Sequence, residues 1–100
     1  MRKIRNPSSE IPWPGLEEFQ SDFLASRKVE LIALVAALSR SDFKAIGKQT
    51  HIWKGFAGPY GFQELELLSL ELEESAERED QIRCEILLKE IEDYLGTDEV

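Results

Sequence analysis

Apolar side chains recur every three or four residues along nearly the whole chain, which is the spacing of one face of an α-helix. No segment alternates apolar and polar residues with the two-residue period of a strand. The breaks between the periodic segments are short, so consecutive helices are expected to run antiparallel. The sequence therefore predicts an all-α, antiparallel up-and-down four-helix bundle. Its helices are expected over about 16–38 (as one helix or as a short one that leads into a long one), 42–58, 62–76 and a last stretch that ends at Gly96.

The phase of each segment predicts which side chains form the core. Ser41 or Asp42 is expected to cap the second helix, and Pro59 and Gly61 to end it. Continuing the third helix in phase would bury several charged residues, so the chain is expected to turn within 77–80. The residues predicted to face inward are Phe23, Leu24, Leu31, Leu34, Val35, Leu38, Phe43, Ile46, Thr50, Trp53, Ala57, Tyr60, Phe62, Leu65, Leu68, Ser69, Leu72, Ala76, Cys84, Leu87, Leu88, Ile91 and Leu95.

A length of 100 residues fits one small domain. We expect the bundle to occupy 14–96, with a tail and lid at 1–13 and a second tail at 97–100. The polar start of the chain is followed by Ile11, Pro12, Trp13 and Pro14, which are apolar and conformationally restricted. This stretch is expected to form a short helical or extended segment over one end of the bundle, with Trp13 against the core.

Net charge and composition exclude several classes of function. A net charge of −8 argues against nucleic acid or an anionic membrane as partner and favours a monomer. No apolar run is long enough to span a bilayer and no signal peptide is evident, so a cytoplasmic location is expected. The single cysteine, Cys84, excludes an internal disulfide and, with one histidine, leaves no metal site. No cofactor is expected.

The only histidine, His51, lies on an unusual helix face. At helical spacing its neighbours are cationic or lack a side chain: Lys44, Gly47, Lys48, Lys54, Gly55 and Gly58. Glycine inside a helix costs up to ~1 kcal/mol relative to alanine, so two glycines beside the histidine need a reason, and open access is the simplest. Lys48 and Lys54 are helical neighbours of His51 and could bind an anionic group carried on the imidazole. No phosphate-binding loop, nucleophile motif or carboxylate pair competes with this face as the reactive site.

The motif His51-x-x-Lys54-Gly55-x-x-x-x-x-Gly61 resembles the signature of histidine-containing phosphotransfer (HPt) domains. The upstream pattern Phe23-Leu24…Leu31-x-x-Leu34-x-x-Ala37-Leu38 looks like the first long helix of that family. The resemblance covers about residues 16–95, and the family fold is the bundle predicted above.

The resemblance implies a function in a two-component phosphorelay. His51 would accept a phosphoryl group from a receiver aspartate or a histidine kinase and pass it to another receiver aspartate. Lys54 and Lys48 would offset its charge, and Gly55, Gly58 and Gly47 would let the partner approach. The partner would supply Mg²⁺ and the catalytic apparatus, so the chain would be a carrier and not an enzyme.

In the family, a side chain 22 positions after the histidine commonly accepts a hydrogen bond from the imidazole, and here that position is Glu73. The resemblance thus implies that Glu73 holds Nδ1–H and leaves Nε2 as the nucleophile. Glu66 and Ser69, earlier on the same helix face, are the fallback partners.

Four residues depart from the family pattern: Gly47, Trp53, Phe56 and Pro59. Ile52 and Phe56 flank the histidine face, and we favour a role for both in partner docking, extended by Ile11, Trp13 and Phe19. The alternative is that Phe56 narrows access to His51. The chain would then be an HPt-like adaptor that binds receiver or kinase domains without passing phosphate. A third interpretation is a small acidic helical protein with an incidental histidine.

Overall fold

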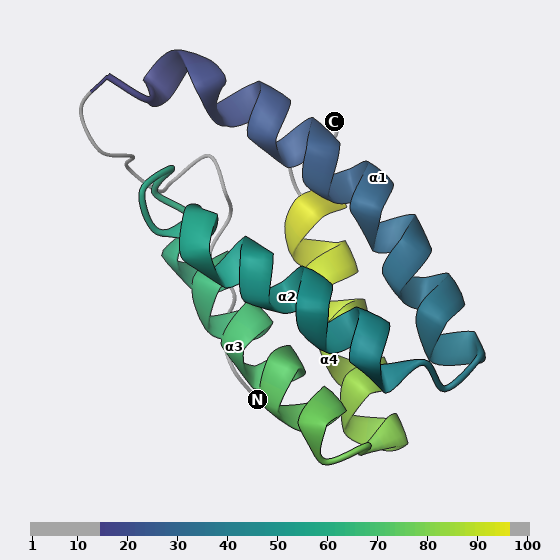
Figure 1. The fold of residues 1–100 in the computed structure, drawn as a ribbon. Helices are drawn as coiled ribbons and strands as arrows, with labels where there is room; N and C mark the ends of the chain where they lie inside the picture. The colour runs from purple at the N-terminus through teal and green to yellow at the C-terminus, as the bar shows by residue number, and fades with distance from the viewer. Residues whose placement is uncertain (1–14, 97–100) are drawn as a thin grey trace.

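A computed structural model describes residues 15–96 (Figure 1). A 3₁₀ turn, η2, leads directly into the first of four α-helices, and loops 40–42, 58–62 and 78–80 connect the helices. Each helix runs opposite to the one before it, and each contacts its two neighbours in a ring, with α1 also against α4. The predicted four-helix bundle is confirmed. The elements are η2 (Glu17–Phe19), α1 (Gln20–Ser39), α2 (Phe43–Ala57), α3 (Gln63–Glu77) and α4 (Gln81–Gly96).

Two terminal stretches lie outside the described residues. The predicted tail and lid at 1–13, which include Ile11 and Trp13, fall there, as does the tail at 97–100. Within the described part, the predicted helix over 16–38 is a short 3₁₀ turn followed by a long α-helix.

The predicted apolar stripes form the core, with one position wrongly predicted to face inward and with two buried apolar side chains, Ala37 and Tyr94, that were not predicted. Val35 is half exposed, at 50%, although its spacing predicts an inward position. It lies at the edge of the buried stripe of α1, beside a small groove between α1 and α4 that Leu38 and Leu88 also line. Phe43 and Tyr60 are partly buried against the core. The four largest side chains in the fully buried set are Trp53, Tyr94, Phe62 and Ile46.

Local sequence determines where α2 begins and ends. Asp42, not Ser41, is the N-cap, and its Oδ1 accepts a hydrogen bond from the Ala45 N–H at 3.2 Å. Gly58 is the C-cap, and Gly61 turns the chain with φ +90°, which glycine adopts without steric cost. Phe62 then donates its N–H to Ala57 O at 2.8 Å, which starts α3 close against the end of α2.

Side chains of the long helix α1 contact α2 and the loop that follows it at two positions along the bundle. Near its start, Phe23 stacks on Tyr60 with ring centroids 4.6 Å apart, and Gln20 Nε2 donates to Tyr60 O at 2.8 Å. Further along, Glu30 Oε1 accepts a hydrogen bond from Trp53 Nε1 at 2.7 Å. Because Trp53 is fully buried two residues after His51, this bond fixes which face of α2 points outward.

Candidate functional site

His51 lies on the outer face of α2, and its side chain is 68% exposed. The opposite face of the helix carries Ile46, Thr50, Trp53 and Ala57, all buried. The buried face orients α2 so that the imidazole projects into solvent. The sequence predicts the same orientation from the apolar phase alone.

The carboxylate of Glu73, on α3, holds one edge of the imidazole. His51 Nδ1 lies 2.9 Å from Glu73 Oε2. An ionised carboxylate can only accept hydrogen bonds, so we assign the proton of the neutral ring to Nδ1. In that tautomer Nε2 carries a lone pair, which makes it the nucleophilic nitrogen.

Lys54 binds the other oxygen of the same carboxylate. Its Nζ donates to Glu73 Oε1 at 2.8 Å, so Glu73 bridges His51 and Lys54. Burial raises the pKa of Glu73, but the hydrogen bonds from Lys54 and His51 outweigh that effect and leave the pKa below its ordinary 4.5. Glu73 is therefore ionised at neutral pH and remains a hydrogen-bond acceptor for the ring.

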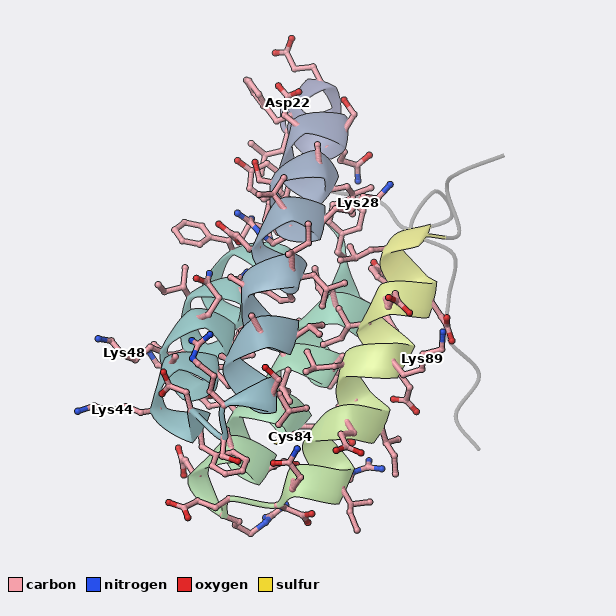
Figure 2. All side chains as sticks on the ribbon, turned by 90° about the vertical axis from the view of Figure 1, so that its right-hand side faces the viewer. Asp22, Lys28, Lys44, Lys48, Cys84 and Lys89 are labelled. Carbon is pink, nitrogen blue, oxygen red and sulfur yellow. The ribbon has the colours of Figure 1, made fainter. Side chains whose placement is uncertain are left out.

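Two further lysines extend from α2 on the His51 side. Figure 2 shows Lys44 and Lys48 pointing outward into solvent. Both residues are exposed, and within the described part of the chain neither forms an ion pair. Lys48 precedes His51 by three residues, about one helical turn, and its ammonium group is free to move toward a group carried on Nε2.

The glycines named from the sequence have different surroundings. A Cβ added at Gly47 or Gly55 would meet nothing within 4 Å, so both positions are open. At Gly58 a Cβ would lie 3.2 Å from Glu66 Oε2, so this glycine makes room for the Glu66 side chain of α3. Gly61 is buried in the turn after α2.

A groove of about 630 Å³ lies beside the imidazole, between the first half of α2 and the second half of α3. Ile52 lines the groove, whereas Phe56 does not, although each is about half exposed. Among the groove residues that were not named as site residues from the sequence, three lie at the end of α3 or just after it: Ala76, Glu77 and Glu79. They come near His51 only because α3 packs antiparallel to α2, and no local signal marks them.

The two fallback hydrogen-bond partners predicted for the imidazole, Glu66 and Ser69, lie in environments different from that of Glu73. The Glu66 carboxylate packs against Gly58, and Ser69 is fully buried in the core. The hydrogen bond of His51 Nδ1–H is accepted by Glu73 Oε2 instead.

No protein-family model matches the chain, and no similar protein is found among curated proteins or solved structures. Across residues 15–96, no helix combines the length and apolar character needed to cross a bilayer. The same residues hold no group of three or more His, Cys, Asp or Glu side chains arranged to bind a metal ion. What the site offers chemically is one exposed, oriented imidazole nitrogen between cationic side chains.

Proposed function

We propose that this chain is a phosphoryl carrier of the HPt type, which accepts a phosphoryl group on His51 Nε2 and passes it to a receiver aspartate. The observation that carries the proposal is the hydrogen bond between His51 Nδ1 and Glu73. A carboxylate on Nδ1–H orients the ring, selects Nε2 as the nucleophile and stabilises positive charge on the ring.

The proposed step needs no separate base. The Nε2 lone pair forms a bond to phosphorus, and the bond between phosphorus and the oxygen of the donor aspartate breaks. The donor leaves as a free carboxylate. The ring keeps its Nδ1 proton and becomes a cationic phosphoimidazole, whose charge lies beside the ionised Glu73. Transfer to an acceptor aspartate reverses these bonds.

The cationic side chains stabilise the charge of the transferred group. Lys48 is unpaired within the described residues and can bind a phosphoryl oxygen directly. Lys54 already donates a hydrogen bond to Glu73. It can therefore bind the phosphoryl group either with its other two ammonium hydrogens or by giving up its bond to Glu73. Gly47 and Gly55 keep the surroundings of the ring free of side chains.

The first test is the reactivity of His51 itself. The protein is incubated with phosphoramidate, a small phosphoryl donor, and the product is followed by ³¹P NMR and intact mass. We expect one phosphoryl group that is labile in acid and stable in base, and none in His51→Gln. Because the chain has a single histidine, the assignment is unique. A label that persists in His51→Gln, or no label at all, contradicts the proposal.

The second test is transfer to a partner. Phosphorylated protein is mixed with purified receiver domains in the presence of Mg²⁺, and loss of the label from His51 is followed together with its gain on the receiver. Transfer to at least one receiver supports a carrier. Binding of a receiver without transfer would support the adaptor function instead.

A further inference from the structure

The outer surface of α1 carries a second apolar stripe that none of the other helices described within residues 15–96 covers. Ala25, Val29, Ile32 and Ala36 recur at spacings of four, three and four residues, which is the seam of a coiled coil. All four are exposed, with Val29 at 68% and Ile32 at 72%. The other stripe of the helix, which includes Leu24, Leu31 and Leu38, is buried in the bundle. In Figure 2, α1 lies in front with its outer surface uncovered by the other helices.

The order of residues in this seam is nearly symmetrical. Small alanines stand at both ends and two β-branched residues in the middle. An antiparallel copy of the same helix would therefore set Ala25 opposite the second Ala36, and Val29 opposite the second Ile32. A seam that matches its own reverse is what a two-fold symmetric interface requires, because both subunits use the same patch.

Charges at the two ends of the seam match as well. Asp22 lies in the first turn of α1 and Arg40 at its C-cap, and both are exposed on the same flank of the stripe. In the antiparallel pairing, Asp22 of each subunit lies within about one residue of Arg40 of the other subunit. The dimer therefore has one Asp22–Arg40 ion pair at each end of the seam. Arg40 contacts Asp42 within its own chain only at 3.8 Å, so it can reorient at little cost.

We propose that the face formed by Ala25, Val29, Ile32 and Ala36 binds a second copy of this chain, as a symmetric antiparallel α1–α1 dimer. His51 hydrogen-bonds toward α3 and its site lies on α2 and α3, so the dimer does not depend on the proposed phosphotransfer. The net charge of −8 leads the sequence to predict a monomer, and it opposes association of two copies. The seam spans only about three helical turns, so the interface is small and the dimer reversible.

Sedimentation equilibrium of the intact chain, over micromolar to millimolar concentration, tests the interface. We expect the average mass to rise from 11.5 kDa toward twice that value. Ile32→Glu should weaken dimerisation at least about tenfold, because it buries a charge at the centre of the seam. Ile82→Glu is the matched control, since Ile82 is 70% exposed on α4, and it should not change the mass. A wild-type mass that stays at 11.5 kDa, or a dimer that survives Ile32→Glu, overturns the proposal.

Charge reversal tests the antiparallel register. Asp22→Arg and Arg40→Asp should each weaken the dimer, because each sets like charges opposite one another, and the double variant should restore it. Circular dichroism of each variant checks that α1 remains folded. As an independent test, Val29→Cys and Ile32→Cys proteins are mixed and oxidised. The mixture should cross-link faster than either variant alone, whereas equal rates would overturn the antiparallel pairing.

Discussion

At the scale of single residues, the site depends on one carboxylate that uses both its oxygens. Glu73 accepts from His51 through Oε2 and from Lys54 through Oε1, and its side chain is only 14% exposed. A glutamine at this position would keep one acceptor oxygen but lose the charge and place an NH₂ group against one of the two donors. Orientation of the ring and pairing of the lysine are therefore coupled through Glu73.

This coupling predicts how stability depends on pH. The pKa of Glu73 is lowered in the folded protein, so its contribution to stability is complete above about pH 4.5, its ordinary pKa. That contribution is lost as pH falls through the lowered pKa. Urea denaturation should show wild type about 1 kcal/mol more stable than Glu73→Gln at neutral pH, with the difference shrinking in acid. The same substitution at the exposed neighbouring residue, Glu74→Gln, provides the matched control. A difference for Glu73→Gln that stays constant down to about pH 3 would contradict the prediction.

Lys54 is predicted to act mainly on reactivity. Lys54→Ala should slow phosphorylation of His51 by phosphoramidate about tenfold, equivalent to about 1.4 kcal/mol in the barrier, because a cation beside the phosphoryl group is lost. Its pairing with Glu73 near the surface contributes at most about 1 kcal/mol to stability, so the variant should remain folded. Lys44→Ala, which removes an exposed lysine near the start of α2, about two helical turns before His51, should react nearly as fast as wild type. Collapse of thermal stability in Lys54→Ala would instead assign the lysine a structural role.

At the scale of elements, α2 combines a fully buried face with an outer face that keeps glycines in a helix interior. Gly47 and Gly55 have open space around them, so nothing in the packing of the described residues requires the absence of a side chain there. Gly61 is different, because its φ of +90° makes it a requirement of the turn between α2 and α3.

Substitutions of these glycines should therefore have opposite effects. Gly55→Ala should stabilise the protein by up to about 1 kcal/mol, because alanine is the better helix former. Gly61→Ala should destabilise it by about 1–2 kcal/mol, because its backbone conformation is strained for a residue with a Cβ. Urea denaturation measures both, and the opposite order would contradict the described turn.

A larger residue at Gly55 tests the reason for keeping glycine there. Gly55→Gln should leave helicity unchanged or higher by circular dichroism, and it should slow transfer between His51 and a receiver domain. Reaction of the same variant with phosphoramidate, a much smaller donor, should be less affected. Unchanged transfer to the receiver would mean that open access at Gly55 has no part in docking.

At the scale of the whole molecule, a polar network between α1 and α2 sets the rotation of α2, which carries His51, about its own axis. Glu30 Oε1 accepts from Trp53 Nε1 and also pairs with Arg27 at 2.7 Å. The Arg27 guanidinium in turn lies 4.5 Å above the ring of Phe23, which stacks on the aromatic residues after α2. The network connects α1 to Trp53, the buried side chain that orients His51.

Removal of this acceptor should destabilise the whole bundle. Glu30→Ala leaves the buried indole N–H without its acceptor, which costs about 1–3 kcal/mol. A double-mutant cycle checks the cause: in a Trp53→Phe background, which lacks the N–H donor, Glu30→Ala should cost distinctly less. Equal costs in the two backgrounds would show that the Trp53–Glu30 bond contributes nothing to stability.

The sequence by itself determined the helices, their ends and most of the core. Apolar periodicity and end signals such as Asp42 and Gly61 act over a few residues, so they can be interpreted without knowing the packing. The same local phase was enough to predict that His51 faces outward. Glu73 is an intermediate case: it was named from a family resemblance, because periodicity cannot single out one acid from the run Glu71–Glu74.

Only the tertiary structure decided the contacts between helices. The register of α3 against α2 selects Glu73, brings Lys54 to its second oxygen and sets Glu66 against Gly58. Val35 is half exposed beside the groove between α1 and α4, and the approach of α1 to α2 makes Glu30 the acceptor for Trp53. These contacts depend on distances between segments far apart in the chain. They follow from how the loops and the packed core position the helices, which local residue patterns do not specify.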